Sequence, residues 1–248
     1  MHKHWVLRAV IAMARRPVDA AGERPRGPSR TSGKQPGGQK VARGSYAVIG
    51  PATRAKILDA ALKCILKHGY HGTTTLMVQE MAGVSRGSLL NQFPTKADLI
   101  AALSVEIIRK RSSAYAEVLD GQDYYKRFAL MMDVQWAELR KPGGIARLEI
   151  MVAAISDAAL RKRISAHNAE VDAELKEQTW LAALKIGITD RKEMDDVVTQ
   201  SMAALRGLAI DVIYPRPGCD VDAAFELIKQ THMEAVDRLV ASGKGSRK

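Results

Sequence analysis

The chain has 248 residues, enough for one small and one larger folded unit. Hydrophobic residues make up 46% of it and aromatic residues only 5%, a composition rich in Ala, Leu, Met and Lys that favours helices over a β-rich fold. The formal net charge of +11 suggests a polyanionic partner, while two cysteines are too few for a disulfide framework, so a cytoplasmic location is expected.

Residues 1–51 are expected to form a disordered, basic extension. Ten cations and two acidic residues within positions 1–52 supply +8 of the net charge. Residues 15–51 contain five prolines and seven glycines and offer almost nothing to bury, so the entropy of ordering them is not offset. The extension is either a functional basic arm or merely a solvated one. The apolar stretch 5–14 is too short and too charged to span a membrane, and no membrane partner is expected.

The first two predicted helices follow directly. Apolar residues recur at three- and four-residue spacing over 53–68, and Gly69 stands where a helix C-cap belongs. A second short helix is predicted within 73–82, because its threonine hydroxyls suit an N-cap. Val78 and Met81 are expected to face inward from it.

A third helix is predicted over 86–93, after the glycine-containing turn 83–85. Leu89 and Phe93 are four residues apart and should both face the core. Residues 95–98 have the T-x-x-D form of an N-terminal capping arrangement, which predicts the start of a long fourth helix.

The second and third helices, joined by a tight turn, form a predicted helix-turn-helix at residues 74–93. Its outward side chains suit base edges, since Arg pairs with guanine and Asn or Gln with adenine. Helix starts and hydroxyls suit phosphates, and a glycine permits close approach of the backbone. Double-stranded DNA is therefore the expected partner, contacted by Thr74, Ser85, Arg86, Gly87, Ser88, Asn91, Gln92 and Lys96.

A family resemblance strengthens this interpretation. It is carried by Thr53-Arg54-Ala55-Lys56-Ile57-Leu58-Asp59-Ala60-Ala61, Gly69-Tyr70, Thr73-Thr74, Ala82-Gly83-Val84-Ser85, Gly87-Ser88-Leu89 and Phe93-Pro94-Thr95-Lys96. In order and spacing these residues resemble the DNA-binding domain of the TetR family of transcriptional regulators. The resemblance implies such a domain at 52–100.

Four residues depart from the family pattern. Leu90 stands where the family usually has a tyrosine that touches the DNA backbone, so Leu90 joins the expected contacts without a hydroxyl. Asn91 and Gln92 replace a frequent His or Trp-His pair, and Leu76 takes a position that is often basic. DNA binding is expected to persist with an operator preference of its own.

The remainder reads as helical, so the predicted fold class is all-α: a three-helix DNA-binding domain, then a helical domain at 101–242 and a basic tail at 243–248. Helices are expected at 124–140, 145–155, 158–185, 190–213 and 221–241, with a break at 142–144. The resemblance implies that the last two pair with their copies in a homodimer, although their apolar stripes would also suit one subunit's own core. The expected interface residues are Val198, Met202, Leu205, Val212, Phe225, Ile228 and His232.

A mostly apolar cavity between the central helices is expected to hold a small, largely hydrophobic effector. Its candidate lining is Met132, Trp136, Met151, Ile155, His167 and Trp180, with the two tryptophans foremost, although such stripes are also typical of plain core. The protein is interpreted as a repressor that the effector releases from its operator.

The sequence also bears on two other classes of protein, an enzyme and a non-specific nucleic-acid-binding protein. No catalytic motif is present, so we expect no enzyme, cofactor or metal site. The alternative interpretation is a non-specific nucleic-acid-binding protein driven by the basic N-terminal extension.

Overall fold

The computed structural model describes residues 50–245, except for the side chains of residues 166, 167, 244 and 245. The expectations for the basic extension (1–49) and for the last three residues lie outside this range. The described part is all-α, as predicted. Its helices are α2 (Pro51–Gly72), α3 (Thr75–Ala82), α4 (Arg86–Gln92), α5 (Lys96–Leu119), α6 (Tyr124–Leu139), α7 (Pro142–Ser156), α8 (Ala158–Lys185), α9 (Arg191–Ile213) and α10 (Val221–Gly245).

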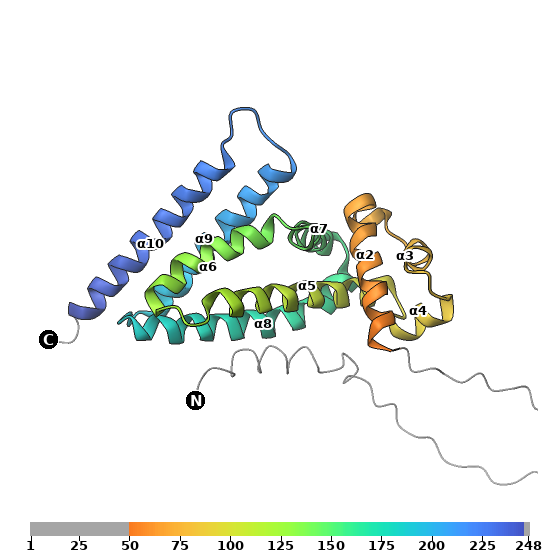
Figure 1. The fold of residues 1–248 in the computed structure, drawn as a ribbon, viewed down its shortest axis with the longest axis horizontal. Coiled ribbons are helices and arrows are strands. Elements are labelled where there is room, and N and C mark those ends of the chain that lie inside the picture. The colour runs from red at the N-terminus through yellow and green to blue at the C-terminus, as the bar shows by residue number, and fades with distance from the viewer. Residues whose placement is uncertain (1–49, 246–248) are drawn as a thin grey trace, which may run out of the picture.

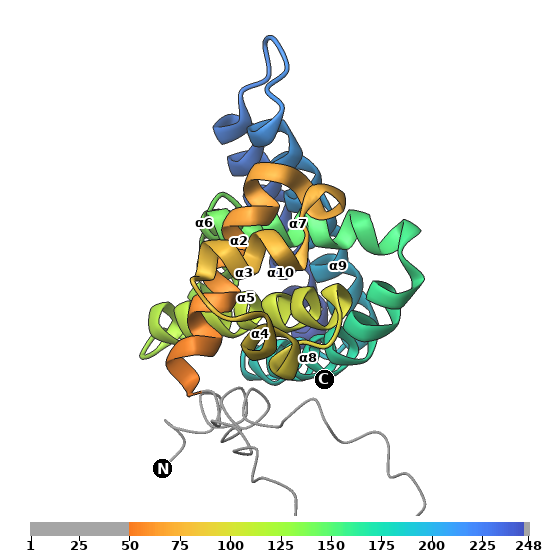
Figure 2. The same ribbon diagram turned by 90° about the vertical axis from the view of Figure 1, so that its right-hand side faces the viewer.

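Helices α2, α3 and α4 lie together at one end of the molecule (Figure 1). Figure 2 looks onto this end and shows α3 and α4 in front of the remaining helices. Helix α2 packs against α3 on one side and against α5 and α7 on the other, while α10 packs mainly against α9. The small helical unit is therefore attached to the larger one chiefly through α2.

Local capping signals set the start of the short helices. The hydroxyls of Thr74 and Ser85 accept hydrogen bonds from the N–H groups of Met77 (3.2 Å) and Ser88 (3.1 Å). Thr95 and Asp98 form a reciprocal capping box at the start of α5. These predicted helix starts are confirmed, because each depends only on residues within one turn.

The sequence predicts a helix end at Gly69 and a break between helices at 142–144, and the structure places only the first as predicted. Gly69 has a positive φ of 67° and interrupts α2 as expected of a C-cap, although one further turn follows it. The expected break at 142–144 is displaced, because Pro142 instead opens α7, where a missing N–H costs nothing. The break between α6 and α7 falls at Arg140 and Lys141.

One apolar core joins α2–α5 to α7 and the start of α8. Ile57, Val78, Leu89 and Phe93 are each at most 2% exposed within it, as predicted. Met81, predicted to face inward, is 46% exposed, although its sulfur lies 3.9 Å from the thiol of the buried Cys64. Helix α3 is only eight residues long, and Val78 is its fully buried residue.

Candidate nucleic-acid interface and cavity

Helix α4 presents one face to the core and the other to solvent. Leu89 and Phe93, each 2% exposed, fix the inner face, and the Arg54 guanidinium lies 4.7 Å from the centre of the Phe93 ring. On the outer face Arg86 and Asn91 are exposed. An isolated helix of seven residues would not be stable in water, so these packing contacts hold the outer face in place.

The other predicted contacts on this face are accessible. Thr74, Ser85, Gly87 and Leu90 are exposed, and Ser88 is half-buried. A Cβ atom added at Gly87 would meet no atom within 4 Å outside its chain neighbours and the backbone of its own helix. The backbone at Gly87 is therefore open to close approach by a partner.

Two predicted contacts are placed differently. Gln92 is half-buried, and its Oε1 atom is buried without a hydrogen-bond partner among the described residues. The Lys96 ammonium lies 4.2 Å from the centre of the Tyr70 ring and 3.4 Å from the carbonyl oxygen of His71. Burial lowers the pKa of Lys96. Neither group points freely outward as expected, because the end of α2 occupies the space beside Lys96.

Polar contacts tie the end of α2 to α7 and α8. The Tyr70 N–H, left free where Gly69 interrupts the helix, donates to Oε1 of Glu149 at 2.9 Å. The Tyr70 hydroxyl donates to the carboxylate of Asp157, which also caps α8. Burial, and then this hydrogen bond, raise the pKa of Tyr70. Sequence reasoning missed this link, because its partners lie far apart along the chain.

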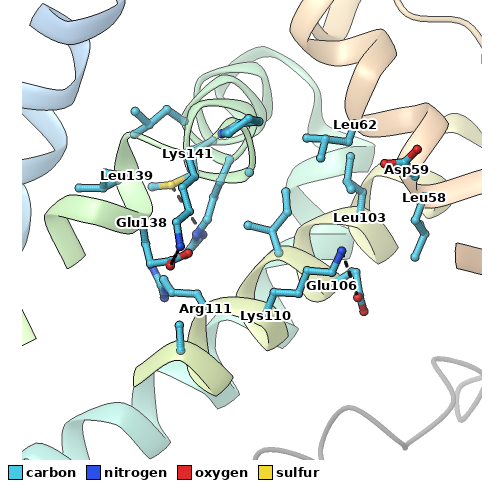
Figure 3. Close-up of a pocket in the computed structure, with 18 of the residues that line it drawn as sticks. Leu58, Asp59, Leu62, Leu103, Glu106, Lys110, Arg111, Glu138, Leu139 and Lys141 are labelled. Atoms are coloured by element: carbon cyan, nitrogen blue, oxygen red, sulfur yellow. Dashed lines mark hydrogen bonds and ion pairs between the residues drawn. The ribbon is translucent and has the colours of Figure 1, made fainter. Parts of the chain in front are cut away.

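A cavity of about 440 Å³ lies between α2, α5, α6 and α7, with Arg206 of α9 also in its lining. Figure 3 shows Leu58, Leu62 and Leu103 toward one end, and Arg111, Glu138 and Lys141 toward the other. Charged side chains lie at both ends, because Asp59 and Glu106 are beside the leucines of α2 and α5. The cavity is within the size range of small-molecule sites in proteins.

Of the residues predicted to line an effector cavity, Met151 does so. Met132 and Trp136 are instead packed between α6, α9 and α10, where Trp136 stacks on Phe225 with ring centres 5.4 Å apart. This corrects the prediction for both residues. Apolar periodicity shows that a side chain faces inward, not whether it meets a neighbour or an empty space.

Two further residues predicted to contact the effector also lie outside the lining of this cavity. Ile155 is 76% exposed at the end of α7 and is not among the residues that line this cavity. Trp180 is half-buried, packs on the core formed with α10, and has the Arg191 guanidinium 5.7 Å from its ring centre. The side chain of His167 lies outside the described residues.

The predicted interface residues of α9 and α10 serve the subunit's own core. Leu205, Phe225 and His232 are buried within it. The other four are half-buried and pack on the same clusters: Val198, Met202, Val212 and Ile228. For Leu205, Phe225 and His232 this burial favours the alternative that the sequence left open, a role in the subunit's own core.

The opposite faces of the same helices carry exposed apolar side chains. Ile210, Ile213 and Tyr214 at the end of α9 are 55%, 49% and 76% exposed, and Leu227 of α10 is 64% exposed. These exposed residues were not predicted as interface residues, because the longer apolar stripe on each helix was assigned to the interface instead. It leaves an apolar surface that a second subunit could cover.

Two negative findings hold for the described residues. No helix between residues 50 and 245 has the length and apolar character needed to cross a membrane. Across the same part of the chain, no group of three or more His, Cys, Asp or Glu side chains is arranged to hold a metal ion.

Comparisons with known proteins agree with this geometry. Residues 57–103 match the model of the family described as bacterial regulatory proteins, tetR family. The HTH-type transcriptional regulator CymR of Pseudomonas putida is 29% identical over 185 residues, which is 73% of this chain and 88% of CymR. The HTH-type transcriptional repressor AcnR of Corynebacterium diphtheriae is 30% identical over 119 residues, covering 48% of this chain and 59% of AcnR.

Solved structures show the same fold. A TetR transcription regulator from Haloarcula marismortui superposes with a TM-score of 0.61 at 19% identity, covering 76% of this chain and 98% of that one. A putative transcriptional regulator from Saccharomonospora viridis, solved in complex with choline, gives a TM-score of 0.59 at 21% identity, with coverages of 73% and 95%. Residues 57–103 therefore match the DNA-binding domain of the tetR family of bacterial regulatory proteins, and the chain shares the overall fold of solved TetR-type regulators.

Proposed function

We propose that this protein is a dimeric regulator whose affinity for a specific DNA operator changes when a small molecule occupies the cavity. The observation that carries the proposal is the position of α2, which lines the cavity and also packs against the helix-turn-helix. In this proposal residues 52–100 bind DNA and residues 101–242 form the dimer, while the effector binds mainly residues 101–242 with α2 as one wall of its cavity.

On the DNA side, α4 enters the major groove with Arg86 and Asn91 toward base edges. The exposed N-termini of α3 and α4, capped by Thr74 and Ser85, approach the phosphates, and Leu90 makes an apolar contact with the DNA backbone. Gln92 contributes only if its side chain turns out of the position seen here. Both half-sites of an operator would then be read by a symmetric dimer.

Helix α7 provides the route from the cavity to the DNA-binding unit. Arg147, Leu148 and Met151 line the cavity, and Glu149 on the same helix accepts the hydrogen bond from Tyr70 at the end of α2. A ligand that binds one position of α7 more tightly than another therefore shifts the orientation of α2. In the direction proposed, the effector favours a spacing of the two α4 helices that no longer matches successive grooves, and the operator is released.

The dimer is proposed to form through the outer faces of α9 and α10. Ile210, Ile213, Tyr214 and Leu227 supply the exposed apolar area there. Sedimentation velocity tests this: Leu227→Asp should convert a dimer to monomers, whereas Leu181→Asp, at an exposed leucine of α8, should not. A dimer that survives Leu227→Asp combined with Ile210→Asp would contradict this interface.

Small-molecule binding has support from a protein of the same fold, since the Saccharomonospora viridis regulator was solved in complex with choline. For this chain the choice of ligand must follow from its own cavity, because the two proteins share only 21% identity.

The test of DNA recognition begins with fragments selected from genomic DNA by the full-length protein. Fluorescence anisotropy at moderate salt should show tight binding to the selected duplex and weak binding to a shuffled one. Arg86→Ala and Asn91→Ala should each weaken specific binding by about 1–3 kcal/mol. Lys176→Ala, an exposed charge on α8, is the control. Equal affinity for selected and shuffled DNA would overturn the proposal.

A further inference from the structure

The charges that line the cavity are not balanced. Its acidic residues are Asp59, Glu106 and Glu138, and each forms an ion pair with a lysine or arginine nearby. Asp59 pairs with Lys63 at 2.8 Å. Glu138 pairs with Lys141. The negative charge of these two residues is therefore already matched.

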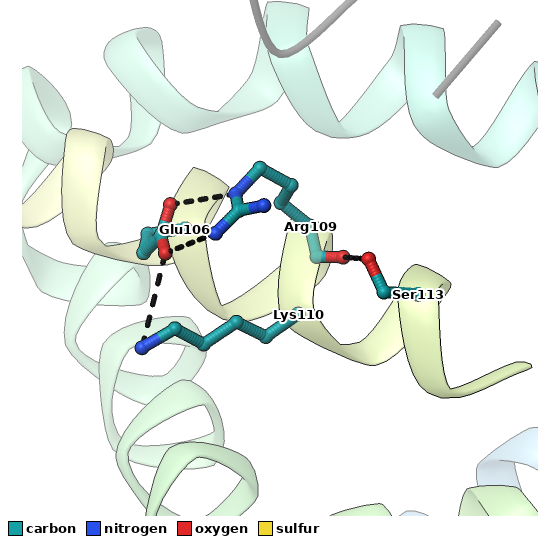
Figure 4. A network of polar contacts seen from close by, with 4 residues as sticks. All are labelled: Glu106, Arg109, Lys110 and Ser113. Carbon is teal, nitrogen blue, oxygen red and sulfur yellow. Dashed lines mark hydrogen bonds and ion pairs between the residues drawn. The ribbon is translucent and has the colours of Figure 1, made fainter. Parts of the chain in front are cut away.

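The negative charge of Glu106 is matched by two cations. Figure 4 shows its carboxylate between Arg109 and Lys110 of the same helix, at 2.7 Å and 3.8 Å. These two cations lower the pKa of Glu106, the hydrogen bond from Arg109 having the largest effect. Glu106 is thus ionised and fully engaged, and it offers nothing to other cations in the cavity.

Three guanidinium groups of the lining remain. They belong to Arg111 on α5, Arg147 on α7 and Arg206 on α9. Within the described part of the chain, none of them has a carboxylate oxygen within 4.0 Å. Arg147 donates a hydrogen bond to the sulfur of Met151 at 3.9 Å, and a thioether is only a weak acceptor.

The pKa of Arg147 shows the effect of this arrangement. The pKa of Arg147 is lowered to about 10, mainly by burial and then by the neighbouring charges of Arg111 and Arg206, while Asp172 acts in the opposite direction. Buried cations are ordinarily paired, because an unmatched charge away from water is costly. Three converging arginines without a carboxylate are therefore arranged for an anion from outside the chain.

The apolar residues of the lining restrict what that anion can be. Leu58, Leu62, Leu103 and Ile107, contributed by α2 and α5, form an apolar wall beside the ion-paired Asp59 and Glu106. A small inorganic anion would leave this wall uncovered. A ligand with an apolar body and a single anionic group would contact both the arginines and the leucines.

We propose that Arg111, Arg147 and Arg206 bind the carboxylate of an organic acid whose hydrocarbon part lies against the leucine wall of α2 and α5. Guanidinium groups suit this task, since their planar pairs of N–H donors match the two oxygens of a carboxylate. The inference refines the proposed function by naming the chemical class of effector. It refines the expectation of a small, largely hydrophobic effector by adding one anionic group.

Two matched pairs of probes test the charge requirement. Isothermal titration calorimetry on the full-length protein would compare octanoate with octanamide, and 3-phenylpropionate with 3-phenylpropionamide. Each amide keeps the shape of its acid and removes the charge. At least one acid should bind about tenfold or more tightly than its amide, because charge-assisted hydrogen bonds are the stronger kind. Amides that bind as well as both acids, or acids that do not bind at millimolar concentration, would overturn the inference.

Substitutions then locate the site. Arg147→Met should weaken binding of the better acid about tenfold or more, and Arg111→Gln and Arg206→Gln should each weaken it as well. Lys176→Met on α8 is the control for the loss of one positive charge. Binding of the acid that is unchanged in all three arginine variants would overturn the assignment. Inorganic phosphate that binds as tightly as the acid would also overturn it, because the apolar wall would then contribute nothing.

The stability of the ligand-free protein separates a ligand site from a structural one. Removing a buried, unmatched charge is expected to raise the midpoint of thermal unfolding in Arg147→Met. An arginine needed for the fold would lower the midpoint, and the Arg111→Gln and Arg206→Gln variants provide the same readout independently. If all three variants lower it by several degrees, the arginines are structural and the inference is wrong.

Calorimetry needs no DNA, so the two proposals can fail separately. If the acid binds through Arg147 but leaves operator affinity unchanged, the proposed regulation fails and the carboxylate site stands. If specific operator binding is found while neither acid binds, the carboxylate site fails and the DNA-binding role stands.

Discussion

His232 makes the stability of the protein depend on pH in a direction that can be calculated. Its ring is 2% exposed, Nδ1 lies 2.9 Å from the hydroxyl of Ser201, and Nε2 is buried without a partner among the described residues. Burial lowers the pKa of His232 from 6.5 to about 4. In the unfolded chain the same ring takes up a proton near pH 6.5. Its contribution to stability is therefore full above pH 6.5 and is lost as the pH falls toward 4.

The size of the effect follows from the proton difference between the two states. Between pH 6.5 and pH 5 the unfolded ring is protonated and the folded ring is not, and the loss is about 1.4 kcal/mol per pH unit, or about 2 kcal/mol in total. Urea denaturation at pH 7 and pH 5, at one protein concentration, would compare the wild type with His232→Gln and with the exposed control His68→Gln. The wild type and His68→Gln should each lose about 2 kcal/mol more than His232→Gln. An equal pH dependence in all three proteins would refute the reasoning.

Three further outcomes are expected. Leu89→Ala should cost about 2–5 kcal/mol in urea denaturation, because its side chain is 2% exposed, whereas Leu90→Ala, 38% exposed, should cost under about 0.5 kcal/mol; equal costs would contradict the two faces assigned to α4. Gly87→Ala should leave the protein at least as stable, since the added Cβ meets no atom outside its chain neighbours and the backbone of its own helix, and yet weaken operator binding measured by anisotropy; undiminished binding would exclude a close approach of DNA at this residue. Tyr70→Phe should lower the midpoint of thermal unfolding more than the control Tyr125→Phe, because the hydroxyl of Tyr125 is exposed. Tyr70→Phe should also reduce the effect of the effector on DNA affinity. An unchanged effect would contradict the proposed route from the cavity through α2.

The DNA-binding unit was largely predictable from the sequence because its determinants are local. The hydroxyls of Thr74, Ser85 and Thr95 cap helices through contacts within three residues. Leu89 and Phe93 are spaced one helical turn apart, so their common burial follows from periodicity. The orientation of Gln92 and Lys96 did not follow, because it depends on neighbours from other turns of the chain.

The cavity was not predictable in the same way, because it depends on which helices face one another. Periodicity correctly turned Trp136 inward, but the ring it meets belongs to Phe225 on a helix far along the chain. A useful signal was nevertheless present. Arg147 and Glu149 interrupt the apolar run of α7, and polar residues within such a run often mark a site or a buried link.

Because α2 forms part of both the cavity wall and the core beneath the helix-turn-helix, the two activities cannot be altered independently there. Leu58 belongs to both, so a substitution that reshapes the binding space for a new compound would also disturb the support of α3 and α4. Attempts to build a biosensor with altered specificity should therefore vary α5, α6 and α7 first. Selection for retained DNA binding would be expected to tolerate changes on those helices and to reject most changes at Leu58.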